Sequence, residues 1–248
     1  MVSIITPTFN SEEWIRATYE SILAQSYCNW EWIVTDDCSC DSTVSILTKI
    51  ESEDSRVKVF KNKVNSGAAV SRNNSISKAT GDYIAFIDSD DLWVPSKLTK
   101  QIQFMENNRI DFSFTAYSLI NSDSRKLEKE VDTHLNSALD YEDMLRKKAT
   151  LGCSTVMLRR SAFEDIMMPD IRTGQDYGLW LKLLKTGVKA HPLAEVLTQY
   201  RLLPNSISRN KFKKAKRQWQ IYRDIEDLGV FKSLICFFFY GWRAVFRK

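Results

Sequence analysis

The residues of this sequence that most clearly indicate chemistry are three carboxylates within four positions. They are Asp88, Asp90 and Asp91 in the stretch IAFIDSDDLWVP, directly after an apolar run. Like charges at this spacing repel and raise one another's pKa. A divalent cation removes that conflict, because Mg²⁺ binds carboxylate oxygens and shares them with substrate phosphates. The cluster predicts either a metal site or a solvated loop in which Asp90 or Asp91 begins the next helix.

The few histidines and cysteines argue against other chemistries. The chain has only two histidines, which disfavours Ser-His-Asp and Cys-His catalysis. Its five cysteines are an odd number in a chain of 248 residues, unlike a secreted disulfide framework. Cys38 and Cys40 have no second cysteine pair with which to form a zinc site. We therefore expect a reduced, cytoplasmic protein.

Length and charge indicate one large domain, or one domain with an appendage. The apolar fraction of 44% is ordinary for a globular core. A net charge of +4 is too small to indicate binding to nucleic acid. The chain enters an apolar run at Val2 without a charged leader, and it has no run of 18 apolar residues. We expect neither a signal peptide nor a membrane-spanning helix.

The elements that must position the carboxylates alternate regularly between strand and helix. Apolar periodicity predicts strands at 2–6, 30–35, 57–61, 83–88 and 112–116, and helices at 12–24, 41–53, 68–79 and 95–107. This alternation predicts an α/β, Rossmann-like fold with a mostly parallel sheet flanked by helices. Ligands of such sheets bind beyond the carboxyl ends of the strands. The polar segments 7–10, 36–41 and 88–91 follow three of these strands and should share one edge.

The pattern weakens after Ser118. Residues 121–139 are polar and charged and are predicted to be a mobile insertion. Strands are expected at 154–158 and 196–200, and helices at 176–186 and 211–227, before an aromatic, apolar stretch at 230–242. No Gly-x-Gly-x-x-Gly follows the first strand, so a nucleotide here would be held by carboxylates and a metal instead.

The motifs, in their order and spacing, resemble the inverting family 2 glycosyltransferases, which have the GT-A fold. The matching motifs are TPTFN at 6–10, VTDDCS at 34–39, DST at 41–43, GDYI at 81–84, DSDD at 88–91 and Pro95. Agreement is close over roughly the first 115 residues, resumes at 152–160 and 174–187, and is looser at 200–208.

The resemblance implies a donor nucleotide site. Residues of the first turn would border the base: Thr6, Pro7, Thr8 and Asn10. Asp37 would accept a hydrogen bond from the pyrimidine, because a uracil N–H is a donor; its alternative is a helix-capping turn. Arg72 would lie near the nucleotide, or form a surface salt bridge.

The resemblance also assigns the acidic cluster. Asp90 would face the ribose, Asp91 would bind Mn²⁺ or Mg²⁺ on the diphosphate, and Asp88 would support them. Many relatives carry a histidine that approaches the metal where this chain has Leu203. Leucine cannot ligate, so we expect weak metal binding without nucleotide.

A second acidic position matches the family's catalytic base. The stretch GQDYGLW at 174–180 resembles Glu-Asp-x-x-Leu-Trp, with Gln175 in place of the glutamate and Trp180 retained as supporting residues. Asp176 stands at the base position, and a sugar hydroxyl needs such a base to become nucleophilic. The alternative is an aspartate that only favours the helix N-terminus.

The C-terminal region has two interpretations. A dense basic group comprises Lys211, Lys213, Lys214, Lys216 and Arg217, and an aromatic stretch follows it. Together they favour a helix resting on an anionic membrane surface. The alternative is a solvated helix whose aromatic end packs on the domain.

The resemblance implies an inverting transfer from a nucleotide sugar, either a UDP-hexose or a UDP-N-acetylhexosamine. The acceptor would be a glycan on polyprenyl diphosphate at the inner face of the cell membrane, in bacterial O-antigen or capsule synthesis. The expected organisation is a GT-A domain at 1–208, with a nucleotide-sugar half at 1–115 and an acceptor half at 116–208, then a helical tail at 209–248. A nucleotidyltransferase and a non-catalytic sugar-nucleotide binding module are the alternatives; the former lacks its glycine- and arginine-rich turn at 6–10.

Overall fold

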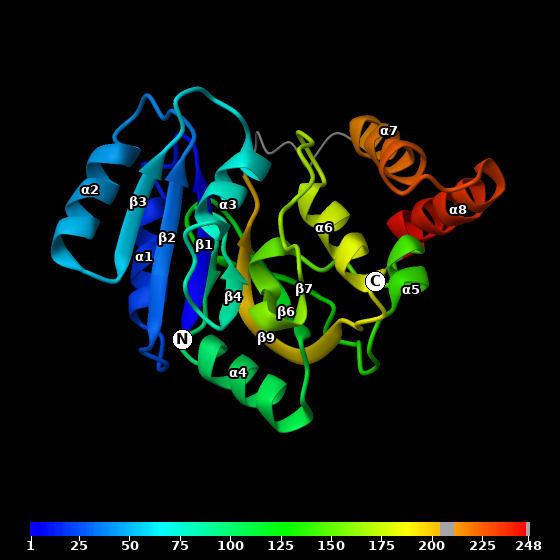
Figure 1. The fold of residues 1–248 in the computed structure, drawn as a ribbon, viewed down its shortest axis with the longest axis horizontal. Coiled ribbons are helices and arrows are strands. Elements are labelled where there is room, and N and C mark those ends of the chain that lie inside the picture. Colours follow the sequence, from blue (N-terminus) through cyan, green and yellow to red (C-terminus); the bar gives the residue numbers. More distant parts are fainter. Residues whose placement is uncertain (204–210, 247–248) are drawn as a thin grey trace.

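The computed structural model describes residues 1–203 and 211–246. Within these residues one curved sheet has the strand order β3-β2-β1-β4-β8-β6-β9-β5, and β7 pairs with β6. Helices cover both faces of the sheet (Figure 1). The predicted α/β class is confirmed, and the fold is built from two halves of different strand polarity.

The N-terminal half is parallel, as predicted. Its strands are β1 (Val2–Thr8), β2 (Trp30–Asp36), β3 (Val57–Lys61) and β4 (Tyr83–Phe86), and its helices are α1 (Ile15–Leu23), α2 (Thr43–Glu53) and α3 (Ala68–Ile76). β1 pairs parallel with both β2 and β4, and β2 pairs parallel with β3. Every residue of β1 and β2 is buried, as expected for strands covered on both faces. The carboxyl ends of these strands meet at one edge.

The following part mixes both polarities. Its elements are β5 (Leu92–Trp93), α4 (Lys97–Asn108), β6 (Phe112–Ile120), β7 (Lys126–Val131), α5 (Tyr141–Leu145), β8 (Val156–Arg159), α6 (Gln175–Leu184) and β9 (His191–Arg201). β8 is antiparallel to both of its neighbours, β4 and β6, whereas β9 runs parallel to β6. The short β5 was not predicted.

The prediction of a mobile insertion at 121–139 is wrong for β7, which pairs antiparallel with β6. Its sequence KLEKEV is charged and largely exposed, so no apolar alternation marked it as a strand. A charged edge strand of this kind resists pairing with other chains.

The C-terminal region forms α7 (Lys211–Gln220), a π-helical turn (Ile221–Ile225) and α8 (Val230–Phe246). α7 and α8 lie at the end of the molecule opposite α2, beside α5 and α6 (Figure 1). The expected domain boundary at 208/209 lies outside the described residues. No helix in the described part of the chain is long and apolar enough to cross a membrane.

Two apolar layers, one on each face of the sheet, hold the helices in place. One layer contains Ile4, Trp32 and Val34, and the other contains Ile5, Phe86 and Trp180. Trp180 is fully buried, and its ring lies 5.6 Å from that of Phe86 and 5.4 Å from that of Phe112. Trp180 thereby anchors α6 to the sheet one turn after the position of Asp176.

Candidate active site

The predicted edge exists, because the segments after β1, β2 and β4 contact one another. The hydroxyls of Ser11 and Ser89 lie 2.8 Å apart. The side-chain oxygen of Asn10 accepts a hydrogen bond of 2.9 Å from the backbone N–H of Cys40. Three loops that are distant in sequence are therefore tied together at the carboxyl ends of the strands, where ligands of open sheets bind.

The residues of the first turn differ in whether their side chains are available to contact a ligand. The Thr6 hydroxyl accepts a hydrogen bond of 2.8 Å from the indole N–H of Trp32, inside the fold. Pro7 is buried within β1, beside Thr35 of β2. The Thr8 hydroxyl is buried and has no hydrogen-bond partner in the described part of the chain. Of this turn, Thr8 and Asn10 stand nearest the free edge, while Thr6 and Pro7 shape the strand beneath them.

Asp37 is buried and organises the turn that leads into α3. Its carboxylate accepts hydrogen bonds of 2.7 Å from the Asn62 side chain, 2.8 Å from the Ser66 N–H and 2.7 Å from the Gly67 N–H. Gly67 has φ +92°, a left-handed conformation that suits glycine. Asp37 therefore fixes the shape of this loop, and a carboxylate oxygen has lone pairs left for a further donor.

Within the acidic cluster, Asp88 is the carboxylate that pairs with a basic side chain. It forms an ion pair with the buried guanidinium of Arg72, and its own side chain is 30% exposed. Its backbone N–H donates a 3.0 Å hydrogen bond to the Ser154 hydroxyl. The predicted alternative of a surface salt bridge for Arg72 does not describe this pair, because Arg72 is only 4% exposed.

Asp91 points into the protein. It is 1% exposed, and its two oxygens accept hydrogen bonds of 2.5 Å from the Ser154 hydroxyl and 2.9 Å from the Arg201 N–H. Burial first, and then the charges of Asp90 and Asp88, raise the pKa of Asp91 well above its usual value. Asp91 thus ties the acidic loop to β9.

Asp90 is less constrained than Asp91. Arg201 Nε donates a 2.7 Å hydrogen bond to the backbone carbonyl of Asp90. This contact therefore does not engage the carboxylate of Asp90. Burial and the neighbouring charge of Asp88 raise the pKa of Asp90 to about 6. A divalent cation would relieve this repulsion.

Asp176 is placed at the start of α6, after Gly174 at φ +75°. One oxygen of its carboxylate accepts a 2.8 Å hydrogen bond from the Tyr177 N–H. The preceding Gln175 has a buried side-chain oxygen without a partner in the described residues. The carboxylate of Asp176 therefore keeps an acceptor position for a substrate hydroxyl.

Arg72 connects the acidic cluster to α6. Burial opposes a charge on its guanidinium, yet acidic neighbours raise its pKa. These neighbours are Cys153, Asp88 and Asp176. Its Nε and Nη1 are buried and have no hydrogen-bond partner within the described chain. Unpaired buried donors are costly, so they mark a position where an anionic ligand fits.

The donor set is consistent with a hard divalent cation that is shared with a ligand. Among the described residues, no group of three or more His, Cys, Asp or Glu side chains could hold a metal ion by itself. Mg²⁺ commonly uses one or two carboxylates and completes its shell with substrate phosphates and water. Leu203, predicted to weaken metal binding, is the second residue after the end of β9.

Sequence reasoning did not identify two supporting residues, Ser154 and Arg201. Besides the contacts to Asp90 and Asp91, Arg201 Nη1 donates to backbone carbonyls of Asn121 and Ser122 at 3.0 and 2.8 Å. Both lie in segments, 152–160 and 200–208, that already matched the family pattern. That match was the available signal, but only the fold shows which carboxylate they hold.

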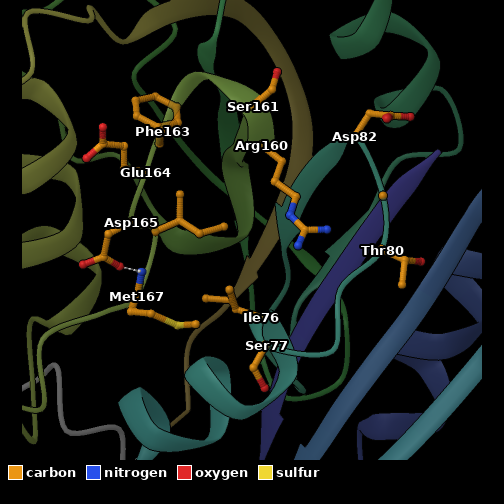
Figure 2. A pocket seen from close by; sticks show the side chains of 12 residues that line it. Ile76, Ser77, Thr80, Asp82, Arg160, Ser161, Phe163, Glu164, Asp165 and Met167 are labelled. Carbon is orange, nitrogen blue, oxygen red and sulfur yellow. Dashed lines mark hydrogen bonds between the residues drawn. The ribbon is translucent and has the colours of Figure 1, made fainter.

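A groove on another part of the molecule contains none of the predicted site residues. It is bordered by the end of α3, the segment before β4 and the segment after β8 (Figure 2). In it Arg160 donates a 2.7 Å hydrogen bond to the Ala79 carbonyl. Because Asp82 precedes β4 whereas Asp88 follows it, this groove and the candidate site lie at opposite ends of that strand.

Comparisons with known proteins identify the family of this chain. The family model for glycosyl transferase family 2 matches residues 3–167. TuaG of Bacillus subtilis (strain 168), a glycosyltransferase assigned to teichuronic acid biosynthesis, is 46% identical over 100% of this chain and 97% of its own length. WfaP of Escherichia coli, a UDP-Glc:alpha-D-GlcNAc-diphosphoundecaprenol beta-1,3-glucosyltransferase, is 41% identical over 97% of this chain and 92% of its own.

Solved structures share the fold. TarS 1–349 of S. aureus, in complex with UDP-GlcNAc, superposes with a TM-score of 0.74 at 21% identity, over 90% of this chain and 65% of that one. The mannosyltransferase PcManGT of Pyrobaculum calidifontis, in complex with GDP-Man and Mn²⁺, gives a TM-score of 0.70 at 17% identity, over 92% of this chain and 64% of that one. The edge carboxylates, the matched family model and these shared folds lead to one conclusion: the chain belongs to glycosyl transferase family 2 and is a glycosyltransferase with the GT-A fold.

Proposed function

We propose that this protein transfers a hexose or N-acetylhexosamine from a UDP-sugar to a lipid-linked glycan, with inversion of the anomeric configuration, in bacterial surface polysaccharide synthesis. The observation that carries the proposal is the ion pair of Asp88 with the buried Arg72, whose pKa is also raised by the negative charge of Asp176. The names of the relatives supply the substrate classes. WfgD, a glucosyltransferase with the same named activity as WfaP, is 40% identical over 92% of this chain.

Asp176 is proposed as the general base. It takes the proton of the acceptor hydroxyl as that oxygen attacks the anomeric carbon, and the UDP leaves from the opposite face. The start of α6 is held by Trp180 against the sheet, so the base is fixed relative to the donor. The unpaired donors of Arg72 suit a hydrogen bond to the negatively charged diphosphate.

A bound Mn²⁺ or Mg²⁺ would offset charge on the leaving diphosphate. We propose Asp88 and Asp90 as the carboxylates that hold it. The family resemblance implied Asp91 for this role and Asp90 for the ribose. The contacts of Asp91 favour a different assignment, because both of its oxygens already accept hydrogen bonds inside the protein. Asp91 would then position Asp90 by holding β9 against the acidic loop.

A lipid-linked acceptor places the reaction at a membrane. We propose a cytoplasmic enzyme that binds peripherally to the inner, anionic face of the cell membrane, where nucleotide sugars and a polyprenyl-diphosphate acceptor meet. The nucleotidyltransferase alternative has no support from the family, whose matched members are glycosyltransferases. The experiment below also distinguishes the non-catalytic alternative.

A donor screen tests the proposal. The protein is incubated with Mn²⁺, a GlcNAc-diphosphate-lipid acceptor and single nucleotide sugars, and both UDP release and the glycosylated lipid are measured. We expect transfer from one UDP-sugar, with UDP-glucose as the first candidate. Tight UDP binding without transfer from any donor to any lipid-linked acceptor would favour the binding module. Release of pyrophosphate from a nucleoside triphosphate and a sugar phosphate would instead identify a nucleotidyltransferase.

A further inference from the structure

Helix α8 carries an exposed apolar face. Its large apolar side chains are exposed by 56% at Val230, 78% at Phe231, 53% at Leu234, 38% at Ile235, 63% at Phe238, 53% at Trp242 and 61% at Phe246. Spacings of three and four residues put Phe231, Leu234, Phe238 and Trp242 on one side of the helix. Contiguous apolar exposure on this scale marks an interaction surface, unlike apolar residues exposed singly.

The opposite face of α8 packs on the protein. Ser233 and Cys236 are buried. The ring of Phe237 packs edge-on against that of Trp219 at 5.6 Å. Lys232 forms an ion pair with Glu142 of α5. The helix is thus anchored with a fixed rotation, and its apolar face is directed away from the core.

The sequence of this region is basic. Residues 230–248 contain Lys232, Arg243, Arg247 and Lys248 and no aspartate or glutamate. In α7, Lys214 and Lys216 are exposed, while the side chains of Lys211 and Lys213 lie outside the described part of the chain. Aromatic apolar residues with basic neighbours are typical of helices that lie in the interface of an anionic bilayer.

The length of α8 fits this arrangement and does not fit a span. Its 17 residues measure about 26 Å, shorter than the hydrocarbon core of about 30 Å. In Figure 1 α8 forms an outer edge of the molecule, so a flat surface can approach it without meeting the sheet.

We propose that α8 binds an anionic lipid bilayer by inserting Phe231, Leu234, Phe238, Trp242 and Phe246 into the interfacial region. The basic residues of α7 and α8 add electrostatic attraction, but the apolar face supplies most of the binding. The inference rests on the proposed function, which gives the reason for an enzyme of this kind to meet a membrane. It adds which surface of the protein binds the bilayer and how that surface makes contact.

Vesicle binding by the full chain tests the inference. The vesicles are phosphatidylcholine alone or with phosphatidylglycerol, and cosedimentation gives the partition coefficient. The double substitution Phe238→Ser with Trp242→Ser is compared with Leu23→Ser with Val64→Ser, a matched pair at exposed apolar positions outside α8. We expect roughly a 10-fold or larger loss for the first pair and less than about a twofold change for the second.

Two further readouts identify the mode of contact. High salt should remove the preference for anionic vesicles but leave measurable binding, since only the electrostatic part is screened. Lipids brominated near the headgroup should quench the indole fluorescence of the wild type, and Trp242→Phe should lose most of this quenching while it still binds. Binding that salt abolishes completely would overturn the insertion.

Another occupant of the face would give a different result. If α8 instead joined two copies of this chain, light scattering would show a dimer that the Phe238 and Trp242 substitutions dissociate, and wild-type vesicle binding would be absent. Transfer to a water-soluble acceptor analogue should be unchanged in the double variant. A failure of the vesicle test with normal transfer would therefore refute the inference without touching the proposed function.

Discussion

The two halves of the molecule hold their proposed site residues in different ways. In the N-terminal half, Asp37 and Asp88 follow parallel strands and are fixed by nearby loops and by Arg72. In the second half, Asp176 begins a helix that is placed by packing of its Trp180 on strands from both halves. We propose that the first arrangement holds the donor and that the second places the base against the acceptor.

Removing the proposed base is expected to have the largest effect on turnover. It should also distinguish the roles of the two halves in transfer and in donor binding. Asp176→Asn keeps the shape of the side chain but removes its ability to take a proton. Turnover should fall by roughly 10²–10⁴-fold, the usual range for general base catalysis. UDP affinity, measured by isothermal titration, should change little, because the proposed donor contacts lie in the other half.

Asp123→Asn, in the exposed loop before β7, serves as the matched control for this substitution. It should retain wild-type turnover. Near-normal turnover in Asp176→Asn would remove Asp176 from the mechanism and would break the proposed division between donor and acceptor halves.

The acidic cluster offers a test within the donor half. Asp90→Asn should weaken UDP binding in Mn²⁺ by roughly 10–100-fold and abolish the difference between Mn²⁺ and EDTA. Asp91→Asn should preserve that difference but lower the melting temperature, because Asp91 bridges Ser154 and Arg201. The reverse outcome would restore the original assignment of Asp91 to the metal.

The sequence predicted the donor half well because its signals are local. Buried strands such as Val2–Thr8 read as continuous apolar runs, and their loops carry the matched motifs. The second half depends on contacts that no local pattern shows. β7 has no apolar alternation, and β9 starts well before its predicted range. The inward turn of Asp91 depends on Ser154 and Arg201, which lie 63 and 110 residues away along the chain.

A buried lysine at the junction of the halves provides a prediction on stability. Lys97 is fully buried; its ammonium donates to Gln101 and lies 4.1 Å from the centre of the Trp93 ring. Burial lowers the pKa of Lys97 to about 7. In the unfolded chain lysine titrates near 10.4, so between these values the unfolded state binds more protons and stability rises with pH.

The free energy of unfolding should therefore rise by about 2 kcal/mol from pH 7 to pH 9 through Lys97 alone. Lys97→Met should remove this rise, whereas Lys100→Met, on the exposed side of the same helix, should keep it. Urea titrations at both pH values measure the difference. Parallel pH profiles for wild type and Lys97→Met would show that Lys97 stays charged in the fold.

The smallest effect is expected at the edge of the second half. Lys126 and Glu130 form an exposed ion pair on β7. Lys126→Gln should change the free energy of unfolding by less than about 0.5 kcal/mol, as is usual for exposed pairs. A loss above about 1 kcal/mol would mean that β7 contributes more to the second half than its exposure indicates.

The anomeric configuration of the product tests the central claim most directly. The central claim is a single displacement in which Asp176 activates the acceptor on the face opposite to the leaving UDP. Proton NMR of the product formed from an α-linked UDP-sugar should show a β-linkage, through the large coupling between the anomeric proton and its neighbour in a glucose-type sugar. An α-linked product would contradict the account, because retention of configuration is incompatible with one direct displacement.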